Sequence, residues 1–179
     1  PISGPSDVVT NGAYFASWAP YNQDSADNGT NGLVVNGTKF LAFNDFPNFS
    51  TVGFNNGYNG YNNPGTSDAN YNDLLQTATY EGFGDGRPVS LSWGGMTAGH
   101  RYLVQIWAND GRGNGRTENF QGGGNISDTV DFGDPPGQYI VGTFVANNSG
   151  LATISLSGVS SPNGDYPQLN LIQVRDLTP

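Results

Sequence analysis

Short runs of β-branched and aromatic residues recur about every ten residues along the chain, and each is bounded by Gly, Asn, Asp or Pro. The 179 residues include 27 Gly, 11 Pro and 22 Asn, so few stretches are long enough to form a stable helix. Regularly spaced strands joined by turns are typical of sandwiches and barrels. The sequence therefore predicts an all-β fold, an antiparallel β-sandwich of jelly-roll type with long Gly/Asn-rich loops.

The strongest strand candidate is the segment 101–109, RYLVQIWAN, which lies between an Ala-Gly and an Asp-Gly turn. The segments 138–146 and 151–156 are separated only by a short polar turn, and this spacing predicts a hairpin. We expect Trp93 and Trp107 to lie in the core because both belong to strand segments. The remaining strand candidates are the ranges 14–19, 33–43, 89–93, 129–132 and 169–174.

One stretch has the signature of a helix. Ser67 and Asp68 are suitable capping residues for a short helix whose apolar positions are Tyr71, Leu74 and Leu75. The range 55–70 just before it is rich in Asn, Gly and Tyr, and we expect a long exposed loop there. No composition change marks a domain boundary, so a single domain over residues 1–179 is expected.

The charge balance excludes several classes of partner. Lys plus Arg is 6 against 15 for Asp plus Glu, a net charge of −9, whereas nucleic-acid binding needs a basic surface. No apolar run is long enough for a membrane-spanning helix, so membrane insertion is not expected. The absence of Cys excludes disulfides but does not fix the compartment. The chain opens at Pro1 and is solubilised mainly by uncharged polar residues. These features favour a processed protein that is secreted, extracellular or bound at the cell surface.

Few residues are suited to catalysis. The chain has one His, one Lys and two Glu, whereas most reactions need a group that titrates near neutral pH or an activated nucleophile. We interpret His100 as an exposed turn residue. Glu81 and Glu118 lie in polar segments that are not expected to raise a carboxyl pKa. The prediction is a non-enzymatic protein without a catalytic residue or an organic cofactor.

The sharpest polar cluster is Asp110, Arg112 and Arg116, directly after the strongest strand candidate. It has two interpretations. The cluster can bind a ligand, with the arginines donating hydrogen bonds to sugar hydroxyls and the aspartate accepting them, or the Asp–Arg pairing can fix the loop at the strand end. Aromatic residues in polar, Gly-rich surroundings are further candidates for contact with a ligand or partner, because exposed rings stack on sugars and form interface hot spots. They are Tyr21, Tyr58 and Tyr61.

Two groups of aspartates are candidates for a structural calcium site, since calcium prefers several oxygen ligands from loops. The first is Asp24 with Asp27, and the second is Asp128, Asp131 and Asp134. Neither matches an EF-hand, and solvated acidic loops are the alternative for both.

Two long segments also carry a family pattern. The first runs from 91 to 112 and continues to 116–117; the second combines 137–144 with 167–175, and the ranges 2–8 and 35–40 match the family's opening. Together they resemble a repeated β-sandwich domain of secreted and cell-surface proteins in planctomycetes, often found ahead of a PEP-CTERM sorting tail. The layout is also similar to malectin and galactose-binding-like domains. The resemblance implies a fold and an extracellular location. Family members often carry a short apolar strand ahead of the Ile-Ser-Gly segment, which here begins at residue 2.

Two functional hypotheses follow. In the first, the chain is a structural subunit that assembles with copies of itself, through sheet edges or strand exchange, into an extracellular filament or surface coat. The scarcity of Lys and Glu, which protect sheet edges in other proteins, favours it. In the alternative, the chain is a carbohydrate-binding module that holds a polysaccharide through loop aromatics and the Asp110 cluster. The sequence alone slightly favours self-assembly.

Overall fold

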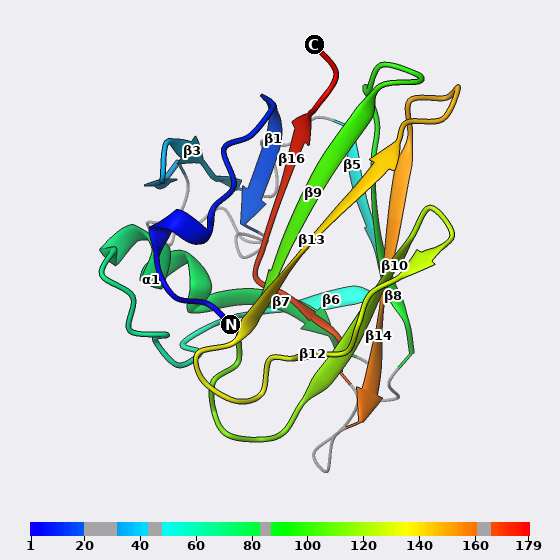
Figure 1. Cartoon of the computed structure of the whole chain (residues 1–179). Coiled ribbons are helices and arrows are strands. Elements are labelled where there is room, and N and C mark those ends of the chain that lie inside the picture. Colours follow the sequence, from blue (N-terminus) through cyan, green and yellow to red (C-terminus); the bar gives the residue numbers. More distant parts are fainter. Residues whose placement is uncertain (20–31, 43–47, 83–86, 161–165) are drawn as a thin grey trace.

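The computed structural model describes residues 1–19, 32–42, 48–82, 87–160 and 166–179 (Figure 1). Within them strands dominate, and two sheets pack face to face as an antiparallel β-sandwich, which confirms the predicted fold class. The first sheet is five-stranded and antiparallel except where β1 and the short β4 run parallel. Its strands, in spatial order, are β13 (Gln138–Val145), β9 (Arg101–Ala108), β16 (Leu171–Asp176), β1 (Ala13–Ala19) and β4 (Leu41–Ala42).

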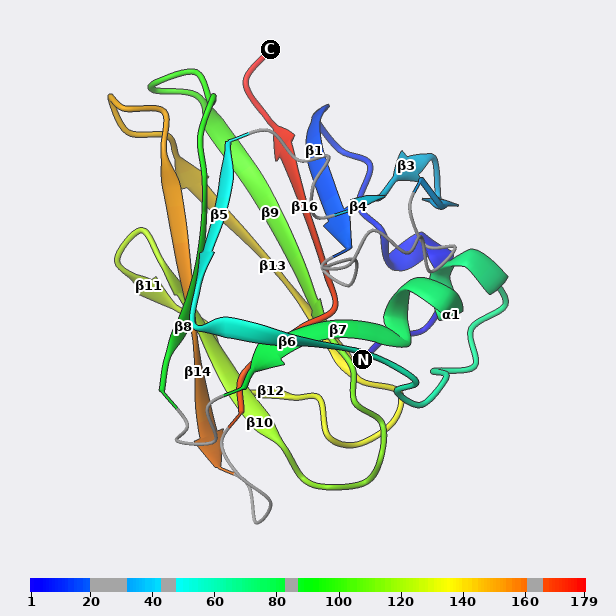
Figure 2. The ribbon, with the colours of Figure 1, turned by 180° about the vertical axis from the view of Figure 1, so that it is seen from behind.

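The second sheet faces the first and is antiparallel throughout. Its strands, in spatial order, are β11 (Asn125–Ile126), β10 (Thr117–Gly122), β14 (Ala152–Ser160), β8 (Val89–Trp93) and β5 (Phe49–Val52). The short β12 (Val130–Asp131) pairs with the beginning of β10. In Figure 2, where the molecule is seen from behind, β5 forms the edge of this sheet opposite β11.

Smaller elements cover one end and one face of the sandwich. Three strands, β15 (Gln168–Leu169), β7 (Thr77–Glu81) and β6 (Phe54–Asn59), form a sheet that crosses below the long strands (Figures 1 and 2). The hairpin β2 (Val34–Val35) and β3 (Thr38–Lys39), the 3-10 turn η1 (Pro5–Asp7) and the helix α1 (Ala69–Leu75) lie beside the first sheet. No helix in the described part of the chain is long and apolar enough to cross a bilayer.

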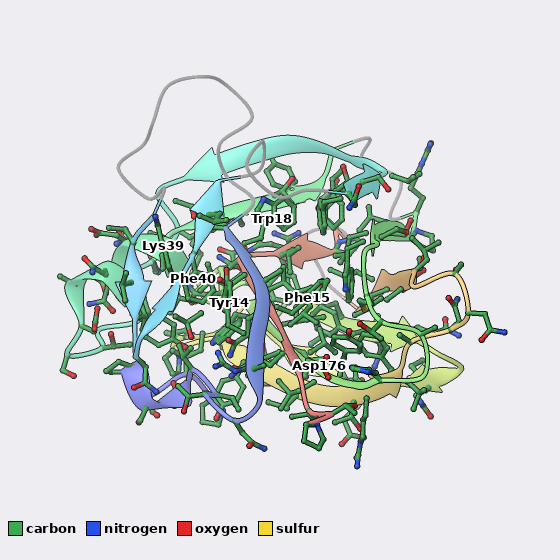
Figure 3. All side chains as sticks on the ribbon, turned by 90° about the horizontal axis from the view of Figure 1, so that it is seen from above. Tyr14, Phe15, Trp18, Lys39, Phe40 and Asp176 are labelled. Carbon is green, nitrogen blue, oxygen red and sulfur yellow. The ribbon has the colours of Figure 1, made fainter. Side chains whose placement is uncertain are left out.

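The central strands of the first sheet, β9 and β16, are buried on both faces. The inner face of this sheet contributes Ile106 and Ile172 to the core between the two sheets, while its outer face buries Trp107 and Leu171 under α1 and the N-terminal segment. In Figure 3, Phe15 and Phe40 lie on opposite sides of β1, one against each cluster. Burial on both faces explains why β9 reads as a nearly continuous apolar run instead of an alternating one.

Two buried glutamines anchor the N-terminal segment across the first sheet. The Gln105 side chain accepts a hydrogen bond from the Val9 N–H at 3.0 Å and donates one to the Asp7 carbonyl at 2.7 Å. Gln173 lies beside it and donates to both Gln105 Oε1 and the Val9 carbonyl. Buried amides stabilise a fold only when they are paired, so these contacts fix how residues 7–9 run over the sheet.

Most of the predicted elements are confirmed. Strands occupy 89–93 and 101–108 almost as expected, and Trp93 and Trp107 are both fully buried. The helix also forms where it was expected, because Asp68 Oδ1 caps it by accepting a hydrogen bond from the Tyr71 N–H at 2.9 Å.

Two predictions about connections are wrong. The segments 138–146 and 151–156 form no hairpin, since β13 pairs with β9 in the first sheet and β14 pairs with β8 and β10 in the second. The turn between them crosses from sheet to sheet, and turn length alone cannot distinguish this crossing from a hairpin. The range 55–70 is not a single exposed loop either. It includes most of β6, whose only neighbour among the described strands is β7. β6 is therefore an edge strand, and its polar sequence is consistent with that position.

Candidate functional site

A polar corner lies where β9 ends, and a buried amide cluster fixes its position. Asn109 directly follows β9 and donates hydrogen bonds from Nδ2 to the carbonyls of Asn62 and Leu75, at 3.0 and 2.9 Å. Asn170 Oδ1 accepts from the Asn109 N–H at 2.7 Å. The next residue, Asp110, donates its own N–H to the Phe132 carbonyl at 2.8 Å. The backbone beneath the corner is therefore held by paired, buried groups.

Alternating glycines shape the loop that follows. Gly111, Gly113 and Gly115 have φ values of 65°, 69° and 65°, in the left-handed region that residues with a Cβ rarely adopt. A Cβ on Gly111 would also lie 2.9 Å from the Asn62 side chain. This tight loop turns back on itself, so that the side chains of Arg112 and Arg116 both reach the carboxylate of Asp110.

Asp110 is the centre of the corner. Its side chain is fully buried and accepts hydrogen bonds from Arg112 Nη2 at 2.8 Å, Asn114 Nδ2 at 2.7 Å and Arg116 Nη1 at 3.1 Å. Burial by itself raises the pKa of the Asp110 carboxyl, but these hydrogen bonds and the charge of Arg112 outweigh it, and the pKa is lowered. The Asp–Arg pairing that the sequence offered as one interpretation of this cluster is confirmed.

Arg112 is the exposed member of the corner. Its side chain is 48% exposed, and its guanidinium lies 5.1 Å from the ring centroid of Tyr61. Tyr61 is only 3% exposed, so its predicted role as an exposed contact residue is wrong. The Tyr61 ring packs against the Arg112 guanidinium in a cation–π contact and does not face solvent.

Two further tyrosines complete a hollow of about 410 Å³ at the corner. Tyr80 lies on β7 and Tyr166 just before β15, and both side chains are half-buried. Arg116 lies between them and the core: its guanidinium is 5.5 Å from the Tyr166 ring centroid and 5.0 Å from that of Phe132. The hollow is lined by Tyr80, Arg112, Asn114, Arg116 and Tyr166. Sequence reasoning missed both tyrosines because only the crossing of the third sheet brings β7 and β15 to the end of β9.

Glu118 lies behind the corner on β10 and contradicts a prediction. It is fully buried, and its Oε2 accepts the Gln168 N–H at 2.8 Å. Burial raises its pKa to about 8, against the opposing effects of the Gln168 N–H and the Arg116 charge. The prediction that the pKa of the Glu118 carboxyl would not be raised was therefore wrong. The sequence held one signal of burial: Phe120, two residues further on, shares the strand face of Glu118 and is buried as well. A raised carboxyl pKa is a mark of catalytic acids, but Glu118 has no surface that a substrate can reach.

Several other predicted site residues fall outside the part of the chain that the structure describes. Tyr21, Asp24 and Asp27 lie outside the described residues, as does the side chain of Tyr58, whose backbone belongs to β6. No three acidic or histidine side chains of the described chain come together as a metal site. The calcium site expected at Asp128, Asp131 and Asp134 is therefore not formed by those three carboxylates.

His100 lies far along the fold from the corner. Its Nδ1 is 2.8 Å from Asp176 Oδ2, near the end of the chain. The hydrogen bond with His100 is the main reason why the pKa of Asp176 is lowered. The pair joins the turn before β9 to the end of β16. His100 therefore lies in a turn as predicted, but its side chain is half-buried and paired instead of exposed.

Comparisons with known proteins define the fold. No known protein family matches the sequence, and no curated protein matches it. Among solved structures, the ectodomain of ANX2, a receptor-like kinase of Arabidopsis thaliana, is similar with a TM-score of 0.69 and 11% identity over 93% of this chain. The chain spans about half the length of that structure, 50%.

Two other structures share the arrangement. In the complex of the plant peptide RALF23 with FER and LLG2, the match has a TM-score of 0.60 and 13% identity, over 98% of this chain and 52% of the other. A calcium-binding mutant of Bacteroides uniformis beta-glucuronidase 2 gives 0.62 and 11%, over 91% and 18%. The β-sandwich fold expected from the sequence is thus confirmed. The planctomycete and PEP-CTERM part of the resemblance stays a prediction.

Proposed function

We propose that the chain is a non-catalytic, extracellular carbohydrate-binding module that holds a polysaccharide at the polar corner. One observation carries the proposal. Two half-buried tyrosines and a half-exposed arginine surround a hollow whose polar groups are already fixed by a buried carboxylate. Sugar rings offer apolar faces that stack on aromatic side chains, and their hydroxyls hydrogen-bond to groups such as Arg112 and Asn114.

The charge of the corner favours an acidic sugar. The guanidinium groups of Arg112 and Arg116 both line this hollow, and no carboxylate of the described residues does. Glu118, behind the corner, has a pKa of about 8 and so keeps its proton at neutral pH. In a chain of net charge −9, such a cationic hollow is a distinctive place for the carboxylate of a uronic acid.

The fold supports an extracellular role for the module. The similar plant structures are receptor ectodomains, and the bacterial one is part of a beta-glucuronidase. These proteins share the fold at low sequence identity, so the structural similarity does not indicate the ligand. The residues of the polar corner do.

The test is isothermal titration with polygalacturonate and with a neutral glucan of similar length. We expect polygalacturonate to bind more tightly, and its affinity to fall as salt is added. Arg112→Ala should weaken binding by about tenfold or more, because it removes a charged hydrogen-bond donor. Tyr80→Ala should also weaken it, because it removes a stacking surface.

Two variants outside the corner serve as matched controls. Arg101→Ala removes an exposed arginine on β9, and Tyr14→Ala removes a 47% exposed tyrosine on β1. Both should bind like the wild type. If the corner variants retain full affinity, or if all four variants lose it equally, the corner is not the glycan site.

Self-assembly through sheet edges or strand exchange into a filament or coat is the second candidate. The observation that favours it is the free outer edge of β13, which pairs only with β9 within the described residues. None of the structural comparisons supports it. Sedimentation of the purified chain decides the matter: a monomer at every concentration argues against assembly, and discrete oligomers or polymers argue for it.

A further inference from the structure

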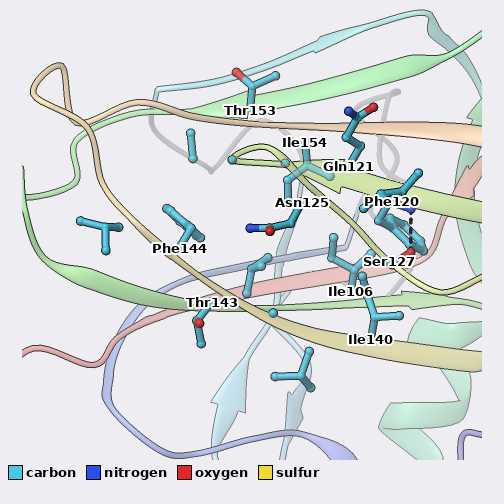
Figure 4. Close-up of a pocket in the computed structure, with 18 of the residues that line it drawn as sticks. Ile106, Phe120, Gln121, Asn125, Ser127, Ile140, Thr143, Phe144, Thr153 and Ile154 are labelled. Carbon is cyan, nitrogen blue, oxygen red and sulfur yellow. Dashed lines mark hydrogen bonds between the residues drawn. The ribbon is translucent and has the colours of Figure 1, made fainter.

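A second hollow, here called the apolar groove, shares no lining residue with the polar corner. It has a volume of about 750 Å³ and runs between β13 of the first sheet and β10, β11 and β14 of the second. Figure 4 shows Ile140 and Phe144 of β13 on one wall and Phe120 and Ile154 on the other. Along this side the two sheets do not close on each other.

The rim of the groove concentrates exposed apolar surface. Eight large apolar side chains are exposed among the described residues, and four of them line this one groove. These four are Ile126 (68% exposed), Val141 (47%), Val145 (63%) and Leu151 (46%). Exposed apolar side chains gathered around one groove mark a binding site more often than scattered single residues do.

The wall formed by β13 has a free backbone edge. All eight residues of β13 pair with β9 on one side, from Gln138 opposite Ala108 to Val145 opposite Arg101. No described strand pairs with the other side. Just before β13, the Gly137 carbonyl accepts a hydrogen bond from the Ile2 N–H at 3.0 Å. A main-chain hydrogen bond from the N-terminal segment is therefore made directly before β13 begins.

The lining identifies the chemistry of the occupant. Among the residues that the structure describes, Asp128 is the only charged one that lines the groove, so the walls favour an uncharged occupant with at most a basic end. A free strand edge offers N–H and C=O groups at a regular spacing, which an extended polypeptide matches and a lipid or a sugar does not. The eight residues of β13 give a length of about 27 Å at ~3.4 Å per residue.

We propose that the apolar groove docks an extended apolar strand from another polypeptide. The strand pairs with the free edge of β13 by main-chain hydrogen bonds. Its alternate side chains enter the gap between the sheets and contact Phe120, Phe144 and Ile154. This site is separate from the polar corner, and the proposal does not depend on glycan binding.

The probe is a blocked synthetic peptide of alternating valine and threonine with one lysine at each end, titrated at a protein concentration that sedimentation shows to be monomeric. Two control peptides carry N-methyl groups on either the valine or the threonine amides. A paired strand uses the N–H groups of one edge, so at least one methylated peptide should bind more than about tenfold more weakly. If the parent peptide does not bind, or if both methylated peptides bind as tightly as the parent peptide, the proposal is wrong.

Gly142→Leu tests the location. Gly142 pairs with Val104 and lines the groove. A Cβ added at Gly142 would lie 3.7 Å from Val104 Cγ1, which is ordinary contact, so a side chain fits there and fills the gap. We expect this variant to fold with unchanged or higher thermal stability and to lose the peptide by at least about tenfold. Val159→Leu, an exposed change on β14 outside the groove, should bind like the wild type.

The variant also separates the outcomes. Unchanged peptide binding by folded Gly142→Leu would overturn the assignment to the groove. If the wild type self-associates at high concentration and Gly142→Leu does not, a second copy supplies the strand. Polysaccharide binding at the polar corner should be the same in both proteins, so a failure of either proposal leaves the other measurable.

Discussion

Replacing Glu118 by Gln should stabilise the protein, and increasingly so as the pH rises. Glu118 is fully buried on β10, and only its Oε2 has a hydrogen-bond partner, the Gln168 N–H. Burial raises the carboxyl pKa from 4.5 to about 8. A Gln amide fills nearly the same space and can accept the same hydrogen bond without carrying an ionisable group.

The sign of the effect follows from proton linkage. Between pH 4.5 and about 8 the folded chain keeps a proton on Glu118 that the unfolded chain has lost, so stability falls as pH rises through this window. Above it, both states are ionised and the penalty is constant. At about 1.36 kcal/mol for each pKa unit, the full penalty is on the order of 5 kcal/mol. Glu118→Gln carries none of it.

The assay is urea unfolding of both proteins at several pH values between 4 and 9. We expect equal free energies of unfolding near pH 4, where Glu118 is protonated in both states, and this point serves as the internal control. The variant's advantage should grow to several kcal/mol by pH 8 and then level off. A difference that is constant with pH, or that is largest at pH 4, would refute the assignment of a buried neutral carboxyl.

Two further predictions concern the polar corner and its support. Asp110→Asn should cost about 3 kcal/mol at neutral pH, because buried Arg116 loses its charged partner. Because the pKa of Asp110 is lowered, its contribution to the stability of the wild type is lost only as the pH falls through that lowered value. The variant should lack this acid-dependent step in thermal unfolding. If wild type and variant lose thermal stability identically at acid pH, the pairing is contradicted. Asn170→Leu should cost about 3 kcal/mol or more in chemical unfolding, because Asn170 Nδ2 donates to three buried carbonyls. A loss below about 1 kcal/mol would mean that water replaces the amide.

Local patterns were sufficient for much of the secondary structure. Val89–Trp93 and Arg101–Ala108 are dense in residues that favour strands and end at turn-forming residues, so their boundaries follow from nearby sequence. Asp68 caps α1 by a hydrogen bond three residues along the chain, a contact that is local by nature.

The candidate site was only partly visible in the same way. Asp110, Arg112 and Arg116 lie within seven residues, and their pairing follows from that closeness and from the glycines between them. Tyr80 and Tyr166 joined them from distant strands. No property of either tyrosine in its own segment distinguishes it from the aromatic residues of the polar range 55–70.

What the sequence by itself determined is therefore part of the set of strands, including β8, β9 and β13, and the charged cluster at the end of β9. The tertiary structure alone decided which strands share a sheet, that Tyr61 and Glu118 are buried, and that β13 keeps a free edge beside an apolar groove. The physical reason is range. Turn and strand preferences depend on neighbours a few residues away, whereas burial, a carboxyl pKa and the pairing of a strand edge depend on what the rest of the chain brings next to it.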